Sequence, residues 1–187
     1  HTHLRFGGQR HMCISTAPNS PLKLDPGEGL GPRYYWFHPN LNIVYFSAEQ
    51  GCSVTGYNLD VSTGGLSAFQ TITTLPEGYT GRNTCSQIQV SPSGKFLYVP
   101  NRGHNSIAGF TVDASNGHLT AIGHVPTEAV PNAFSLDPDG KFIVAVGSAS
   151  GGLSSYRIDG DTGELTLLET LPVGQRPAGV LISDLGD

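Results

Sequence analysis

The sequence predicts an all-β protein, namely an incomplete β-propeller built from four-stranded antiparallel blades, with about three whole blades plus part blades. The first observation is a repeat, because residues 37–72, 90–125 and 136–171 align without a gap. The second is that each stretch contains short runs rich in β-branched and aromatic residues, separated by turn-forming pairs such as Ser93-Gly94 and Asn116-Gly117. Four short strands that recur every 46 to 53 residues are typical of propeller blades. Four sets of identical residues occupy equivalent positions in the three copies: Pro39, Pro92 and Pro138; Asp60, Asp113 and Asp159; Gly64, Gly117 and Gly163; Leu66, Leu119 and Leu165.

The composition fits many short strands joined by tight turns, because the 187 residues include 25 Gly and 13 Pro. The net charge of -5 and the lack of a basic run interleaved with aromatic residues argue against a nucleic-acid partner. No apolar run approaches the length needed to span a membrane, so we expect no membrane partner. The cysteines, Cys13, Cys52 and Cys85, are odd in number and lack metal-ligand spacing, which favours a reduced, cytoplasmic protein.

Residues 1–30 read as the remnant of a preceding blade, because MCIST and PLKL are short apolar fragments that suit outer strands. His1, His3 and His11 lie near the terminus, and no carboxylate or cysteine completes a metal-ligand set with them. We therefore interpret these histidines as part of a flexible segment, and the sequence predicts no metal and no other cofactor.

The three whole blades follow in order, at approximately residues 31–79, 80–129 and 130–173, within a single partial domain of residues 1–187. In the first blade the predicted strands are PRYYWFHP, IVYFSAE, SVTGYNLD and LSAFQTI. The link LPEGYTGRNT, residues 75–84, is longer than its counterparts, and such loops are where binding residues are expected. Residues 174–187, with RPAGVLISD, begin a further blade, so missing blades or self-association are expected partners of the exposed ends.

Strand direction predicts on which of the two faces each candidate functional residue lies, because the start of an inner strand and the end of the second strand lie on the same face of a blade. His38 falls at the opposite turn, where Ser91 and Asp137 are its repeat copies, and a turn-stabilising role is favoured for it. The residues expected at one mouth of the central channel are Arg33, Asn83 and Asn132, which precede or open inner strands, and Glu49, Asn101, Arg102 and His104, which follow second strands.

The chemistry of these side chains leaves two interpretations open, an anionic ligand or a surface salt bridge. The guanidinium groups of Arg33 and Arg102 suit bidentate binding of a carboxylate or phosphate. Glu49 beside two arginines would stay ionised and could orient or deprotonate a water molecule. His104 is the other candidate base, with hydrogen bonding to its turn as the alternative. No Gly-x-Ser-x-Gly elbow or phosphate-binding glycine loop is present, so covalent serine chemistry is not expected; His118 and His124 are expected at the surface.

The run NTCSQIQVSPSGKFLYVPNRGHNSIAGFTVD, with GPRYYWFHPNLNIVYFSAEQ before it and VPNAFSLDPDGKFIVAV after it, resembles the lactonase family of seven-bladed propellers. That family includes bacterial 6-phosphogluconolactonase and fungal carboxymuconate cyclase. The resemblance extends from about residue 27 to residue 182 and implies roughly the C-terminal half of such a propeller. It also implies departures from the family pattern, with Tyr34 where a histidine is common, Gln87 where a glutamate is common and Asn132 where an arginine is common.

The resulting hypothesis is a lactonase-like hydrolase that acts on an anionic sugar lactone such as 6-phosphogluconolactone. Glu49, His104 and Arg102 are the catalytic candidates, and the predicted substrate-binding residues are Arg33, Asn83, Gln87, Asn101 and Asn132. The resemblance leaves two alternatives open. One is a cycloisomerase of the carboxymuconate type, and the other is a propeller that binds a ligand or partner without catalysis, which Gln87 and Asn132 would suit.

Overall fold

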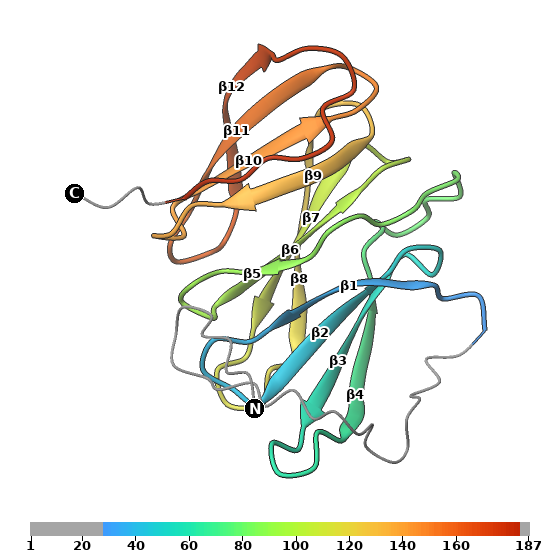
Figure 1. Ribbon diagram of the computed structural model, residues 1–187, viewed down its shortest axis with the longest axis vertical. Coiled ribbons are helices and arrows are strands. Elements are labelled where there is room, and N and C mark those ends of the chain that lie inside the picture. Colours follow the sequence, from blue (N-terminus) through green and yellow to red (C-terminus); the bar gives the residue numbers. More distant parts are fainter. Residues whose placement is uncertain (1–27, 184–187) are drawn as a thin grey trace, which may run out of the picture.

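The computed structural model describes residues 28–183, which form twelve strands in three four-stranded antiparallel sheets and no helix (Figure 1). This confirms the predicted all-β class and the four-stranded repeat. The first sheet contains β1 (Pro32–Phe37), β2 (Ile43–Ala48), β3 (Ser53–Leu59) and β4 (Leu66–Thr73). The second contains β5 (Gln89–Val90), β6 (Phe96–Asn101), β7 (Ser106–Val112) and β8 (Leu119–Pro126), and the third β9 (Pro131–Leu136), β10 (Phe142–Gly147), β11 (Gly152–Ile158) and β12 (Leu165–Pro172).

The sheets are arranged face to face like the leaves of a fan, with each sheet following the previous one along the chain (Figure 1). Strand order follows sequence order within every sheet, so β1, β5 and β9 are the first edge strands and β4, β8 and β12 the last. The three sheets also share an irregularity. In each, the pairing of the third and fourth strands shifts register at the equivalent place, after Gly56, Gly109 and Ser155.

The predicted Asp–Gly turns between the third and fourth strands have the same conformation in all three sheets. Gly64, Gly117 and Gly163 have φ angles of 76°, 74° and 75°, in the left-handed region that glycine adopts without steric cost. At the opposite end of the strands, His38 is buried and stabilises a turn, as expected. Its Nδ1 accepts the N–H groups of residues 40 and 41, so its Nε2 carries the proton and donates to the Gly94 carbonyl at 3.0 Å.

Two hydrophobic cores fill the seams between neighbouring sheets. The first joins the first and second sheets, and the second joins the second and third sheets. A tyrosine on the second strand of one sheet reaches the turn of the next sheet at each seam. Tyr45 donates to the Gly117 carbonyl at 2.6 Å, and Tyr98 donates to the Gly163 carbonyl at 2.8 Å. These bonds fix the position of each sheet against the next, since burial of an unpaired tyrosine hydroxyl would cost free energy.

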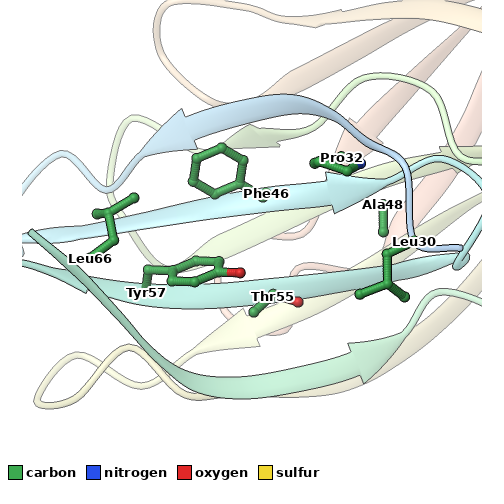
Figure 2. Close-up of a pocket in the computed structure, with 7 residues that line it drawn as sticks. All are labelled: Leu30, Pro32, Phe46, Ala48, Thr55, Tyr57 and Leu66. Atoms are coloured by element: carbon green, nitrogen blue, oxygen red, sulfur yellow. The ribbon is translucent and has the colours of Figure 1, made fainter. Parts of the chain in front are cut away.

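The outer faces of the first and third sheets lack such a neighbour in the described part of the chain. On the first sheet, a pocket of about 120 Å³ opens between Leu30, Pro32, Phe46, Ala48, Thr55, Tyr57 and Leu66 (Figure 2). On the third sheet, Leu168 and Leu171 remain 47% and 45% exposed. Each end of the fan therefore presents an apolar sheet face.

The predictions for residues 1–27, including the remnant blade strands, His1, His3, His11 and Cys13, lie outside the described residues. After β12, residues 173–183 form no strand, although the Ile182 N–H donates to the Ser135 hydroxyl of β9 at 3.1 Å. The assignment of this segment to a further blade stays a prediction. Residues 28–183 contain no helix of the length and apolarity that crossing a membrane requires.

Candidate functional site

A β-bulge places Arg33 at the candidate site. Along β1, Pro32 pairs with Ala48 and Tyr34 pairs with Ser47, which leaves Arg33 as an extra residue without a cross-strand partner. A bulge turns the side chain of its extra residue away from the regular pleat. Arg33 therefore extends toward the end of β2 instead of lying over the sheet face with its neighbours.

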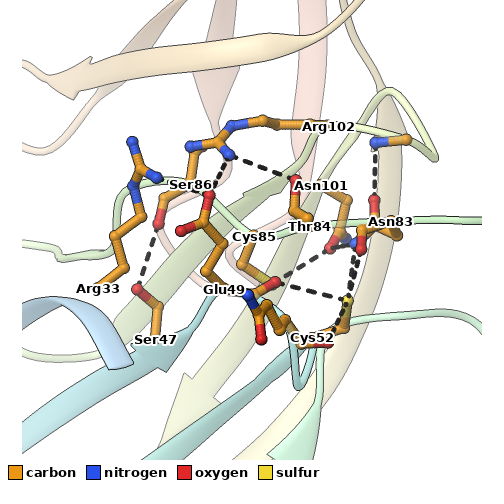
Figure 3. A network of polar contacts seen from close by, with 12 residues as sticks. Arg33, Ser47, Glu49, Cys52, Asn83, Thr84, Cys85, Ser86, Asn101 and Arg102 are labelled. Atoms are coloured by element: carbon orange, nitrogen blue, oxygen red, sulfur yellow. Dashed lines mark hydrogen bonds and ion pairs between the residues drawn. The ribbon is translucent and has the colours of Figure 1, made fainter. Parts of the chain in front are cut away.

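Three charged side chains meet at the seam between the first and second sheets. Glu49 directly follows β2, and Arg102 directly follows β6. The Oε1 atom of Glu49 accepts hydrogen bonds from Nη1 of Arg33 and from Nη1 of Arg102, each at 2.6 Å (Figure 3). Strand direction predicted this convergence. His38 lies beyond the other end of β1, also as expected.

The two ion pairs set the ionisation of the cluster. Hydrogen bonds from Arg33 and Arg102 lower the pKa of the Glu49 carboxyl below its ordinary value of 4.5. The hydrogen bond to Glu49 raises the pKa of Arg33 above its ordinary value. The site thus contains two cations and one anion near neutral pH, and it retains one excess positive charge.

The segment between β4 and β5 forms hydrogen bonds with the backbone of both Arg102 and Glu49. The Arg102 N–H donates to the Thr84 carbonyl at 2.9 Å, and Arg102 Nη1 donates to the Thr84 hydroxyl at 3.3 Å. The next N–H group, that of Cys85, donates to the Glu49 carbonyl at 2.9 Å. Sequence reasoning missed Thr84, because its partner Arg102 is distant in sequence and no motif marks it.

Arg102 has unused hydrogen-bonding capacity. Its side chain is 14% exposed, and its Nε and Nη2 atoms are buried with no hydrogen-bond acceptor among residues 28–183. These two N–H groups form the edge of a guanidinium that binds a carboxylate or phosphate side-on. Arg33 is the accessible cation of the pair, with 37% of its side chain exposed.

Asn101 and Asn83 lie in a buried network and not at an open mouth, which differs from the expectation for them. Asn101 is fully buried; its Oδ1 accepts from the Thr74 hydroxyl and from Asn83, and its Nδ2 donates to the Thr74 carbonyl. The Asn83 Oδ1 accepts the N–H groups of residues 103 and 104. Both amides therefore fix the loop after β6, and their polar groups are already paired.

The thiols of Cys52 and Cys85 belong to the same network. Both cysteines are free and buried, and burial raises the pKa of the Cys85 thiol to about 12. The Asn83 amide lies 3.3 Å from the Cys52 sulfur, and the Thr74 hydroxyl lies 3.0 Å from the Cys85 sulfur. A protonated, enclosed thiol is inert, so Cys85 supports the site without acting as a nucleophile.

His104 turns away from the charged cluster. Its Nδ1 lies 2.8 Å from the Ser106 hydroxyl, and its ring packs edge-on against the rings of Tyr79 and His124. His124 is on β8, the last strand of the second sheet, so His104 faces the outer strands and not the channel. His124 itself is half-buried and contacts the Thr74 carbonyl at 2.9 Å, which corrects the expectation of a surface residue, whereas His118 is exposed as expected.

Of the remaining candidates, Gln87 precedes β5 in the second sheet and Asn132 lies on β9 in the third. The Gln87 Oε1 accepts the Phe134 N–H at 2.9 Å and so connects the two sheets. Asn132 is the extra residue of a bulge in β9, the repeat copy of Arg33, and is half-buried. Ser86 occupies the same repeat position in the second sheet and donates to the Pro131 carbonyl at 3.0 Å. Alignment of the repeats could have identified Ser86.

The described residues contain no group of three or more His, Cys, Asp and Glu side chains that could hold a metal ion. Among the candidate residues, Arg33 and Glu49 have exposed polar groups, and the edge of Arg102 is buried with no acceptor in residues 28–183. Two guanidinium groups can bind an anion or polarise a carbonyl, and an ionised carboxylate can orient water.

Comparisons with known proteins identify relatives that share this architecture. A family model described as a seven-bladed β-propeller lactonase matches residues 14–182. A 6-phosphogluconolactonase of Pectobacterium carotovorum is 37% identical over 109 residues, which cover 58% of this chain and 33% of the relative. Two solved structures match at TM-scores of 0.77 and 0.79. They are a Lactobacillus plantarum protein with 34% identity, covering 81% of this chain and 44% of that one, and a periplasmic gluconolactonase of Pseudomonas aeruginosa with 26% identity, covering 84% and 44%. The chain thus spans about a third of the length of its curated relatives.

Proposed function

The chain belongs to the lactonase family of seven-bladed β-propellers, and from this premise we propose that it is a lactonase-like hydrolase that acts on an anionic sugar lactone. The substrate class follows from the excess positive charge of the Arg33–Glu49–Arg102 cluster. A phosphorylated lactone such as 6-phosphogluconolactone carries the anion that this cluster would attract, and the relatives named 6-phosphogluconolactonase support that choice. The observation that carries the proposal is the meeting of two arginines on one carboxylate at the seam between the first and second sheets.

In the proposed reaction, water adds to the lactone carbonyl carbon, the bond from that carbon to the ring oxygen breaks, and a carboxylic acid forms. Arg33 and Arg102 bind negative charge and stabilise the oxyanion that develops on the carbonyl oxygen. The second carboxylate oxygen of Glu49 orients the water and accepts its proton, which then passes to the departing ring oxygen and makes it a hydroxyl group. Because the ion pairs lower the pKa of Glu49, the carboxylate is ionised throughout the neutral range but is a weak base, so its contribution is mainly orientation.

His104 is a less suitable base than Glu49, because its ring contacts Ser106, Tyr79 and His124 and not the arginine cluster. The network around Asn83 and Asn101 then has a supporting role in the proposal. It holds the loop that carries Arg102, so these two amides act on the reaction through the position of a guanidinium.

A non-catalytic, ligand-binding propeller is the second candidate, and Gln87 favours it. An amide cannot act as a base, and the Gln87 carbonyl oxygen already accepts the Phe134 N–H group. Under this alternative the arginine cluster would bind an anion without turnover.

The experiment that separates these candidates measures turnover and binding on the same samples. Acid release from 6-phosphogluconolactone is followed in a pH-stat, loss of ultraviolet absorbance is followed with carboxymuconate, and calorimetry measures binding of 6-phosphogluconate. We expect acid release above the spontaneous rate, weakened strongly by Arg102→Gln and unaffected by Arg157→Gln, an exposed arginine on the third sheet. Binding without acid release would establish the non-catalytic candidate, and absorbance loss with carboxymuconate alone would establish the cycloisomerase.

A further inference from the structure

Two neighbouring side chains of β4 fill the outer end of the seam between the first and second sheets. The pairing of β3 with β4 shifts register after Gly56, and both Phe69 and Gln70 contact the second sheet. The Phe69 ring covers Gly56, and 5.0 Å separates its centroid from that of the His118 ring. The Gln70 Nε2 donates to the Leu119 carbonyl at 2.9 Å, and its Oε1 accepts the Leu119 N–H at 2.7 Å. One flat amide thus pairs a donor and an acceptor on the edge strand β8.

The seam between the second and third sheets lacks these two side chains. Ile122 and Gly123 on β8 occupy the repeat positions of Phe69 and Gln70. Isoleucine is smaller than phenylalanine, and glycine has no side chain. Gly123 also has a φ of 152°, in a region that residues with a side chain rarely adopt. The repeat therefore leaves the outer end of this seam unfilled.

A cavity of about 260 Å³ lies at this place, and we call it the second-seam groove. Its walls come from β6, β7 and β8 of the second sheet and from residues 163–166 of the third. Ile107, Ile122 and Val125 are part of its apolar lining, and the exposed residue Glu164 is part of its polar lining. Both walls belong to sheets whose four strands are all described, so the groove lies between two whole blades.

The third sheet offers a backbone donor and acceptor at this groove. Leu165 lines the groove and is the repeat copy of Leu119. It pairs with Ile158 of β11, but the Ile158 N–H donates to the Lys141 carbonyl on the other side of that strand. Such an antiparallel pair exchanges no hydrogen bonds, so the Leu165 N–H and C=O lie on the free edge of β12. No described side chain pairs with them, whereas Gln70 pairs with the same groups of Leu119.

We propose that the second-seam groove binds an aromatic primary carboxamide. The amide of the ligand takes the position that Gln70 has in the first seam: its NH₂ group donates to the Leu165 carbonyl, and its oxygen accepts the Leu165 N–H. The aromatic ring takes the space that Phe69 fills in the first seam. A cavity of about 150 Å³ holds a benzene ring, so this groove has room for a ring that carries an amide.

The recognition needs one donor and one acceptor on the same planar group. A ketone lacks the donor, and a carboxylate has acceptors only. The Glu164 carboxylate in the lining also disfavours an anion. The ligand class thus differs from the anions that the Arg33–Glu49–Arg102 cluster would attract, and the inference is independent of the proposed lactonase activity.

The first experiment titrates benzamide into the isotope-labelled 187-residue chain and follows the backbone amide resonances by NMR. We expect the Leu165 and Gly123 resonances to shift and to saturate. The Leu119 resonance is the internal control and should not move, because Gln70 already accepts that N–H group. An unchanged Leu165 resonance up to the solubility limit of benzamide would overturn the proposal.

Two ligands of similar shape test the amide contact. Acetophenone keeps the ring and the carbonyl oxygen but has a methyl group in place of the NH₂ group, and benzoate replaces the amide with a carboxylate. One hydrogen bond of the usual net strength changes a dissociation constant by about 10-fold, so acetophenone should bind about 10-fold more weakly than benzamide. Benzoate should bind more weakly still. Equal dissociation constants for benzamide and acetophenone would show that the Leu165 carbonyl accepts no hydrogen bond from the ligand.

Exchange of residues between the two seams tests the location. Ile122→Phe gives the second seam the aromatic residue of the first, so it should weaken benzamide binding by about 10-fold or more and leave lactone turnover unchanged. The reciprocal double variant, Phe69→Ile with Gln70→Gly, should make the Leu119 resonance respond to benzamide. Unweakened binding by a folded Ile122→Phe variant would place the ligand outside the groove. If either variant failed to fold, the Leu165 shift and the comparison of ligands on the unaltered chain would still decide the proposal.

Discussion

Replacing Glu49 with glutamine removes a charge from the centre of the site while it keeps the size of the side chain. The ion pair with Arg102 is partly buried, and a charge-assisted hydrogen bond there contributes about 1–2 kcal/mol. The pair with Arg33 is more exposed, and solvent reduces its contribution to below about 1 kcal/mol. The sum is about 2 kcal/mol, which lowers the melting temperature of a chain of this size by roughly 4–8 °C at neutral pH.

The pH dependence of this difference identifies its cause. Because the pKa of Glu49 is lowered in the folded protein, its charge stabilises the fold above the ordinary value of 4.5. The stabilisation is lost as pH falls through the lower folded pKa, where the carboxyl becomes neutral like the amide. Melting curves of the two proteins should therefore differ most near pH 7 and converge at acid pH. Other carboxyl groups are present in both proteins, so their effects cancel.

Glu77→Gln is the matched control, because Glu77 is an exposed glutamate in the link after the first sheet. It should change the melting temperature little at any pH. In the lactone assay, Glu49→Gln should lower turnover by about 100-fold or more if Glu49 takes the proton of water, and by less if it only orients the arginines. A melting difference that persists unchanged at acid pH, or one that Glu77→Gln reproduces, would refute the ion-pair reasoning.

Three further substitutions test the scaffold around the site. Gly117→Ala should destabilise the fold by about 3 kcal/mol, since its Cβ would add left-handed strain and collide with the Ile43 side chain. Gly78→Ala has the same φ region but open space, so about 1 kcal/mol is expected in chemical denaturation. Tyr98→Phe removes the bond to the Gly163 carbonyl and should cost about 1 kcal/mol by the same measurement; an unchanged midpoint would count against that bond. Thr84→Val should weaken calorimetric binding of 6-phosphogluconate and Thr84→Ser should restore it, whereas equal weakening by both would exclude the hydroxyl.

The fold and the central cluster could be predicted from sequence because both depend on local and periodic information. Alternating apolar residues and Asp–Gly turns define each strand, and the repeat landmarks supply the register of all three sheets. Strand direction then places Arg33 at the start of one strand and Glu49 at the end of the next, so their meeting follows from the order of the elements. The bulge that turns Arg33 toward Glu49 was not visible, since it depends on the pairing of β1 with β2.

The predictions for His104 and Asn101 differed from the structure for a different reason. Both side chains follow or end β6, so their sequence position suggests the channel side. Their orientation instead depends on a tight turn, in which Asn105 has a φ of 53°, and on partners far along the chain. Thr74, 27 residues earlier, donates a hydrogen bond to the Asn101 Oδ1 and accepts one from the Asn101 Nδ2. Contacts of this kind have no periodic signature, so a single sequence does not reveal them.

Comparison of equivalent positions explains why the charges collect at one seam. Positions that support the fold keep their residue type through the repeat, as Gly64, Gly117 and Gly163 do. The position after the second strand changes from Glu49 to Arg102 to Ser148, and the bulge position changes from Arg33 to Ser86 to Asn132. Only the first two sheets therefore offer opposite charges across a seam, and the second seam joins an arginine position to a serine. The three sheets share one repeat, and divergence at two of its positions gives one seam an excess positive charge, which the proposed anion binding would use.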